Sequence, residues 1–228
     1  MAFFRFLLQE AADNAMTVLD FTRTISPGMP LFPGTPRLRL KEIAGIGGEG
    51  YRETQLLLTS HTGTHIDAPA HIFPSGKTLE DYPASQFTGS LAVLDCTGFP
   101  PGSEIPASFL EEDPLAPQAE FLFFRTGWEK FWGERRYFEA YPVLSAGAAR
   151  WAAEKGKKAL GFDTPGIDPA EDAALSLHRI MLGSGRTLVI ENLCGLSAAP
   201  AGFLSCAALP LKFEGSDGAP ARVIGWTP

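Results

Sequence analysis

The chain has 228 residues, of which 45% are hydrophobic and 20% are charged, so it is long enough to bury the core of one large domain. Its formal net charge of −7 and the lack of a basic stripe exclude nucleic acid and anionic membranes as main partners. Three widely spaced cysteines (Cys96, Cys194 and Cys206) form no CxxC pair, which indicates free thiols in a reducing cytoplasm.

The chain begins with an apolar run at residues 1–8 that Gln9 and Glu10 interrupt. This run is too short for a secretory signal and far too short to span a bilayer. We therefore expect a soluble, cytoplasmic protein in which residues 1–15 are an extension and residues 16–228 form a single domain.

Short strands alternate with a few helices along the rest of the chain. Strands are predicted at 18–21, 38–43 and 52–59, with a Pro/Gly-rich loop at 27–36. Compact apolar runs at 91–95, 121–124 and 159–162 are typical of buried strands, and 187–190 is a β-branched strand. Helices are predicted at 145–155, capped by Ser145 and stopped by Gly156, and at 171–182. A final strand pair, 209–213 and 222–226, surrounds a turn at 215–218. The class is α/β, with a mixed sheet, mostly non-hairpin strands and few helices.

Three of the four histidines fall in one segment, His61-Thr-Gly-Thr-His65-Ile-Asp67-Ala-Pro-Ala-His71. A helix would turn Asp67 away from His61, and Gly63 and Pro69 disfavour a helix. A straight strand would keep the even offsets on one face but would separate His61 from Asp67 by roughly 20 Å. Ligands of one ion must each reach it at about 2.0–2.2 Å, so the chain must bend, and Gly63 and Pro69 are suited to bend it. The segment is predicted to curl around a metal ion.

Two histidines and a carboxylate suit Zn, Mn or Fe and leave a position open for water. His178, on the second predicted helix, and Glu191, after the strand at 187–190, supply two further ligands and suggest a second ion that shares a carboxylate. Simpler interpretations stay open: His71 as an ordinary hydrogen-bonded histidine, His178 as a histidine on an amphipathic helix, and Glu191 in a structural salt bridge.

The histidine segment resembles the signature H-x-G-T-H-x-D-x-P-x-H of the metal-dependent cyclase superfamily, which includes bacterial kynurenine formamidases and isatin hydrolases. Further stretches agree with this resemblance: Met29-Pro-Leu-Phe-Pro-Gly34, Gly161-Phe-Asp-Thr-Pro, Ile190-Glu-Asn-Leu193 and the segment from Pro210 to Pro220. The resemblance covers roughly residues 16–228. It implies a mixed α/β domain around a twisted, β-barrel-like sheet that usually forms a homodimer or homotetramer.

The resemblance also implies roles for single residues. His61, His65 and Asp67 would bind one ion, Zn or Mn, and Asp67, His178 and Glu191 would bind a second where it is present. His71 would transfer protons. An aromatic residue, typically Trp, precedes the early Pro-Gly in the formamidases and contacts the substrate; Phe32 stands there in this chain. Gly166 stands where many members have serine.

The resulting hypothesis is a metal-dependent hydrolase of a small amide, either an aryl formamide such as N-formylkynurenine or a cyclic amide. Phe32 and its loop would form an apolar wall for an aryl substrate. Two alternatives belong to other classes. His65, Asp67 and His178 match the two-histidine, one-carboxylate pattern of non-haem iron oxygenases. A protein that binds the metal without turnover is the other alternative.

Overall fold

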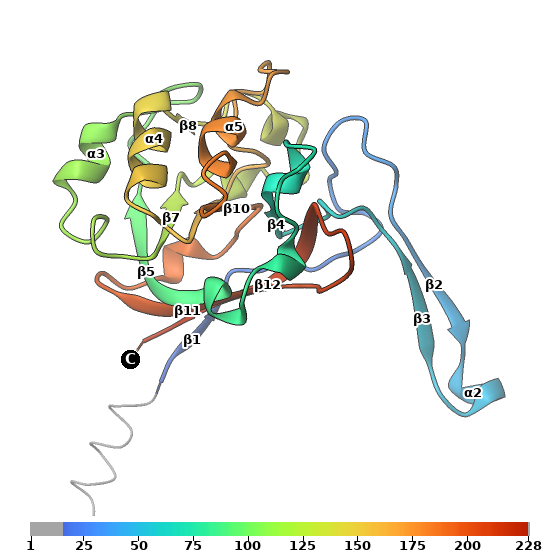
Figure 1. Cartoon of the computed structure of the whole chain (residues 1–228). Coiled ribbons are helices and arrows are strands. Elements are labelled where there is room, and N and C mark those ends of the chain that lie inside the picture. Colours follow the sequence, from blue (N-terminus) through green and yellow to red (C-terminus); the bar gives the residue numbers. More distant parts are fainter. Residues whose placement is uncertain (1–15, 228) are drawn as a thin grey trace, which may run out of the picture.

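A closed barrel of seven strands forms the centre of the computed structural model, which describes residues 16–227 (Figure 1). The strands follow one another around the barrel in the order β12, β11, β5, β7, β9, β10 and β4, and β4 pairs back to β12. Their bounds are β4 (His65–Asp67), β5 (Thr88–Asp95), β7 (Phe121–Arg125), β9 (Ala159–Phe162), β10 (Leu188–Glu191), β11 (Leu204–Pro210) and β12 (Gly218–Trp226). The short strand β1 (Val18–Asp20) pairs with the far end of β12. The expected fold class, a mixed barrel-like sheet with few helices, is confirmed.

The central strands β7, β9 and β10 are buried on both faces, because one face lines the barrel and the other lies under helices. Strands β5, β7, β9 and β10 are parallel, and β4, β11 and β12 pair antiparallel. In β7, Phe121 and Phe123 join the core formed by residues from all seven strands, whereas Leu122 and Phe124 join the core shared with the helices. This alternation is the two-residue period of a strand, and it explains why the sequence of β7 is a continuous apolar run.

Three helices cover the outer face of the parallel strands: α3 (Ala107–Glu112), α4 (Ala146–Glu154) and α5 (Ser176–Leu182). The Ser145 hydroxyl caps α4 by accepting from Ala148 N (3.1 Å), as predicted. The remaining elements of the barrel side are the strand pair β6 (Glu104–Ile105) and β8 (Val143–Leu144), and the short 3₁₀ turns Pro69–His71, Leu79–Asp81, Ala84–Phe87, Trp128–Phe131, Arg135–Phe138 and Leu196–Ala198. No helix within residues 16–227 is both long and apolar enough to cross a bilayer.

A two-stranded hairpin extends away from the barrel (Figure 1). It consists of β2 (Arg39–Ala44), the short helix α2 (Ile46–Glu49) and β3 (Glu53–Leu57), and β2 and β3 pair only with each other. Both strands were predicted, but α2 was not. We call residues 39–57 the arm.

Two predicted boundaries are wrong. The helix expected at 171–182 begins only at Ser176, because Leu175 adopts a left-handed conformation (φ 53°) and Asp172 binds the backbone N–H of Ala174 and Ser176 in a turn. The strand expected at 209–213 lies earlier, at Leu204–Pro210, where small side chains conceal its apolar pattern. The predicted extension, residues 1–15, lies outside the described residues.

Candidate metal centre and active site

The histidine segment bends at the residues that the sequence indicated. Gly63 has a left-handed φ of 67°, which turns the chain between His61 and β4. Pro69 opens the 3₁₀ turn that ends at His71. Between these bends, His65 and Asp67 project from the same face of β4, one strand period apart. Since β4 pairs with β10 in a register that sets Glu191 opposite His65, the barrel brings this distant carboxylate to the same place.

Asp67 lies at the centre of the resulting cluster. Its Oδ1 is 2.6 Å from His61 Nδ1 and 3.2 Å from His65 Nε2, and its Oδ2 is 3.4 Å from His178 Nε2. Glu191 completes the cluster, with Oε2 3.4 Å from His65 Nε2 and Oε1 3.3 Å from His178 Nε2. The structure therefore brings together all five residues for which ligand roles were predicted. No lysine or arginine of residues 16–227 forms a salt bridge with Glu191, which argues against a purely structural salt bridge there.

The geometry of this cluster suits metal ions. Asp67 Oδ2 and Glu191 Oε1 are buried, and neither has a hydrogen-bond partner in the part of the chain that the structure describes. Such orphaned carboxylate oxygens are costly unless a cation meets them. Donors arranged tetrahedrally at 2.0–2.2 Å from one ion lie about 3.3–3.6 Å apart, close to the separations between the Nε2 atoms and the carboxylate oxygens. Three sets of ligand atoms are close enough to share an ion: His61, His65 and Asp67; Asp67, His178 and Glu191; and the less buried set of His61, His71 and Asp217.

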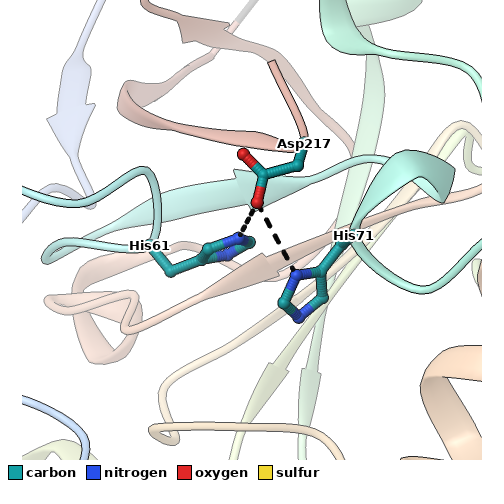
Figure 2. Close-up of side chains that lie close together, drawn as sticks. All are labelled: His61, His71 and Asp217. Carbon is teal, nitrogen blue, oxygen red and sulfur yellow. Dashed lines mark hydrogen bonds and ion pairs between the residues drawn. The ribbon is translucent and has the colours of Figure 1, made fainter. Parts of the chain in front are cut away.

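Each of the three histidines is held in place through the ring nitrogen that points away from the cluster. His65 Nδ1 is bound to the Gly63 carbonyl (2.8 Å), and His178 Nδ1 to the Asp168 carboxylate. His61 Nε2 is bound to Asp217 Oδ2 (3.0 Å), as Figure 2 shows. Such contacts orient each ring and direct its other nitrogen toward the cluster.

Sequence reasoning assigned no role to Asp168 or Asp217. Asp217 lies within, and Asp168 just after, a segment that resembles the cyclase superfamily. This resemblance was the one feature of the sequence that pointed to either residue. Asp217 lies in the loop before β12, whose register with β4 sets Gly218 opposite Asp67. This pairing of strands about 150 positions apart could not be read from local sequence patterns.

His71 lies beside the cluster of five predicted ligands and belongs only to the less buried set that it forms with His61 and Asp217. Its ring stacks at a tilt on the His61 ring, with centroids 4.0 Å apart, and its Nδ1 is 3.9 Å from Asp217 Oδ2, beyond hydrogen-bond distance (Figure 2). Burial is the main cause that lowers the pKa of His71, to about 4, and the attraction of Asp67 only partly opposes it. The imidazole is therefore neutral at pH 7 and free to accept a proton.

Comparison with known proteins agrees with this geometry. Residues 19–169 match the family model described as putative cyclase. The chain belongs to the cyclase family. It is 30% identical to a kynurenine formamidase of Salinibacter ruber over 213 residues, which cover 92% of this chain and 97% of that protein.

Two solved structures extend the comparison. A potential metal-dependent hydrolase with cyclase activity is 29% identical (TM-score 0.74; 94% of this chain and 99% of that chain). Isatin hydrolase A from Labrenzia aggregata, bound to benzyl benzoate, is 25% identical (TM-score 0.82; 98% of each chain). The resemblance inferred from the histidine segment is confirmed, and this cyclase-family protein is a hydrolase.

A cavity of about 350 Å³ opens over the candidate metal centre of this cyclase-family chain. The five candidate ligands and His71 line this cavity. Apolar and largely aromatic residues line it as well: Phe32, Trp132, Phe138, Tyr141, Ile167 and Leu175. Phe32, predicted to contact substrate, is 51% exposed and meets the Phe138 ring edge-on at 6.0 Å. The cavity thus combines a polar reaction side with a surface suited to a flat apolar group.

The structure explains why this family member has glycine at position 166. A Cβ atom there would lie 2.9 Å from the Tyr141 hydroxyl oxygen, too close for an ordinary contact. Tyr141 Oη donates to the Asp168 carbonyl (2.7 Å) and is buried. The tyrosine hydroxyl therefore occupies the space that a serine side chain would need, and it also braces the residue that holds His178.

Replacement of Asp168 by asparagine is expected to weaken metal binding about 10–100-fold, because His178 loses the carboxylate that orients its ring. Titration calorimetry with Zn²⁺ or Mn²⁺ measures this. Asp172→Asn is the matched control, since Asp172 caps the start of α5 without touching a histidine. Equal loss in both variants would assign the effect to helix α5 and not to Asp168.

Metal binding is expected to release protons at pH 7. Burial alone would lower the pKa of His61, but Asp67 and Asp217 together raise it to about 9. An ion must therefore displace a proton from His61, so that apparent affinity rises about tenfold per pH unit up to pH 9 for each proton displaced. Calorimetry in buffers of different ionisation enthalpy counts these protons; a heat independent of the buffer would contradict the prediction.

The raised pKa of His61 has the opposite effect on the stability of the metal-free protein, which is expected to fall as pH rises. Because the pKa of His61 is raised above the ordinary 6.5, its contribution to stability is complete below pH 6.5 and is lost as pH rises through about 9. Thermal unfolding of the chelated protein across this range tests the sign.

Proposed function

We propose that this hydrolase uses one or two divalent ions, Zn²⁺ or Mn²⁺, to hydrolyse a small amide, either an aryl formamide or a cyclic amide. The observation that carries the proposal is that one cavity is lined by five candidate ligands, by the neighbouring His71 with its lowered pKa, and by apolar, largely aromatic side chains. The names of the relatives and structural neighbours, kynurenine formamidase and isatin hydrolase, support amide substrates.

The residues divide into three tasks. His61, His65 and Asp67 would hold one ion, and Asp67, His178 and Glu191 a second. When bound, such an ion lowers the pKa of water toward about 7 and polarises a carbonyl. Phe32, Phe138 and Trp132 would orient the apolar part of the substrate so that its amide carbonyl lies over the ligand cluster.

His71 would move the proton. It accepts a proton from the attacking water as the new C–O bond forms, and it then donates that proton to the departing nitrogen as the C–N bond breaks. The products are an amine and a carboxylic acid, which releases its proton to solvent to become a carboxylate at neutral pH; a cyclic substrate yields both groups in one molecule. Stacking on His61 holds the His71 ring beside the ligand cluster. The low pKa of His71 keeps its imidazole neutral, and therefore able to accept a proton, before each turnover.

A substrate panel on metal-defined protein tests the proposal. N-formylkynurenine, simpler aryl formamides and isatin are incubated with protein loaded with Zn²⁺ or Mn²⁺ and with chelated protein. Hydrolysis of at least one compound, absent after chelation and restored by metal, is expected. Metal uptake without turnover of any compound would favour a non-catalytic binding protein. Oxygen consumption that requires Fe²⁺ would favour the oxygenase alternative, which uses His65, Asp67 and His178 but assigns no role to His61, His71 or Glu191.

A further inference from the structure

The fixed charges around the cavity over the candidate metal centre have one sign. The acidic residues that line the cavity are Asp67, Asp168, Asp172 and Glu191. No lysine or arginine within residues 16–227 lines it. Bound ions would offset Asp67 and Glu191, and Asp168 is bound to His178. Asp172 is then the lining carboxylate whose charge nothing in the described part of the chain offsets.

Asp172 stays ionised at neutral pH. Its carboxylate accepts hydrogen bonds from the backbone N–H of Ala174 (2.9 Å) and of Ser176 (3.0 Å). The bond from Ser176 is the main cause that lowers the pKa of Asp172, and the bond from Ala174 adds to it. A negatively charged group of a substrate in this part of the cavity would therefore meet a second negative charge.

Two arginines on neighbouring segments are engaged away from the cavity. The Arg23 guanidinium lies 4.1 Å from the centroid of the Trp132 ring, and its Nη2 donates to the Glu129 carbonyl (3.3 Å). Arg179, on α5, donates through Nε to the Ala174 carbonyl (2.9 Å). Neither arginine lines the cavity, so neither is placed to neutralise a carboxylate on a substrate.

The N-terminus of α5, where an anion could otherwise bind, is also occupied. The backbone N–H of Ser176 is bound to Asp172, and that of Leu177 to Asp168. The polar groups that remain are neutral. Asn192 lines the cavity and accepts a hydrogen bond from Tyr137 through Oδ1 (2.9 Å), which leaves its amide N–H groups for a carbonyl oxygen.

This set of groups favours one class of substrate over another. An uncharged aryl group with a carbonyl finds apolar walls and a neutral donor in the cavity. A carboxylate would lose its hydration there without gaining a positive partner, and it would be repelled by Asp172.

We propose that the substrate is a neutral aryl amide without a carboxylate, and that the cavity rejects anionic substrates because of its charge. This inference rests on the proposed amide hydrolysis and narrows it. Isatin and simple aryl formamides meet the requirement. N-formylkynurenine, which carries a carboxylate on its amino-acid part, does not.

Two pairs of compounds that match in shape and differ in charge test the proposal. On the metal-loaded full chain, para-formamidobenzamide is compared with para-formamidobenzoate, and isatin carrying a carboxamide on its benzene ring with isatin carrying a carboxylate there. In whichever pair is hydrolysed, kcat/KM is expected to be at least about 100-fold lower for the carboxylate. N-formylkynurenine is expected to be hydrolysed at least about tenfold less efficiently than ortho-formamidoacetophenone, which lacks the amino-acid part.

A positive charge placed in the cavity is expected to weaken this preference. Ala170 lines the cavity and is exposed, so Ala170→Lys supplies a cation without displacing a buried side chain. The ratio of kcat/KM for the carboxylate to that for the carboxamide is expected to rise at least about tenfold in this variant. The ratio cancels any general loss of activity. Ala173→Lys is the matched control, because it adds the same charge at an exposed residue of the same loop that does not line the cavity, and it is expected to leave the ratio unchanged.

The outcomes separate this proposal from the proposed function. Equal kcat/KM within a hydrolysed pair, or an unchanged ratio in Ala170→Lys, would overturn the charge preference. Failure to hydrolyse any of the compounds would instead refute amide hydrolysis. Titration calorimetry with the same pairs then tests the charge preference alone: weaker binding of the carboxylates supports it, and equal or tighter binding overturns it.

Discussion

Replacement of His71 by alanine is expected to lower kcat by about 10²–10⁴ while metal content stays unchanged. The reason is geometric: His71 stacks on His61 at 4.0 Å between ring centroids and belongs to neither ligand set that contains Asp67, but only to the less buried set with His61 and Asp217. Its removal takes away a proton acceptor and leaves the donors of the metal centre in place. Inductively coupled plasma mass spectrometry and steady-state kinetics on the same preparation measure both quantities.

The control for this variant is His178→Ala, for which the reverse pattern is expected. His178 belongs to the second ligand set, so its loss reduces metal content as well as rate. A His71→Ala protein that turns over at the wild-type rate would remove His71 from the mechanism. Loss of metal from the same variant would instead make His71 a ligand, in the set that it forms with His61 and Asp217. Small exogenous imidazole is expected to restore part of the lost rate by entering the vacated space.

Replacement of Asp67 by alanine is expected to abolish binding of both ions and to lower activity by at least about 10³-fold, because metal activation is worth several kcal/mol. Asp67 is the residue shared by the set of His61, His65 and Asp67 and the fully buried set of Asp67, His178 and Glu191. It is also completely buried among three histidines, of which two, His61 and His65, hold its pKa well below the ordinary range by their charge.

Variants that alter only one of the two ligand sets sharing Asp67 distinguish the loss of both ions from general damage to the fold. His61→Ala and Glu191→Gln each alter one ligand set, so each is expected to retain one ion where the wild type binds two. Equilibrium dialysis at saturating metal gives the stoichiometry. If Asp67→Ala keeps an ion with near wild-type affinity, Asp67 does not bridge the two sets.

More of the candidate site than of the fold could be predicted from the sequence, and the reason is physical. Four of the residues in the cavity lie within eleven positions, and their even offsets together with Gly63 restricted the backbone to a bent strand end. The parts that could not be predicted depend on pairing between distant strands. The register of β4 with β10 brings Glu191 to His65, and its register with β12 brings the loop that carries Asp217 to His61.

Local patterns also failed where polar contacts override apolar periodicity. The start of α5 is delayed to Ser176 because Asp172 binds two backbone N–H groups in the preceding turn. The alternation in residues 38–43 and the strand pattern of residues 52–59 predicted two strands correctly. It did not show that they would pair with each other away from the barrel, because the same alternation suits a strand at any half-buried position.

The three-residue strand β4 has a consequence for how this protein folds. It is the strand through which the barrel closes, since it pairs with β10 on one side and with β12 on the other. The same three residues carry His65 and Asp67, so the metal centre cannot be complete before closure. Ion binding then stabilises only the closed state, and amide hydrogen exchange in β4, β10 and β12 is expected to slow together when metal is added. The ion that would serve catalysis would thus also stabilise the last step of folding, which is closure of the barrel.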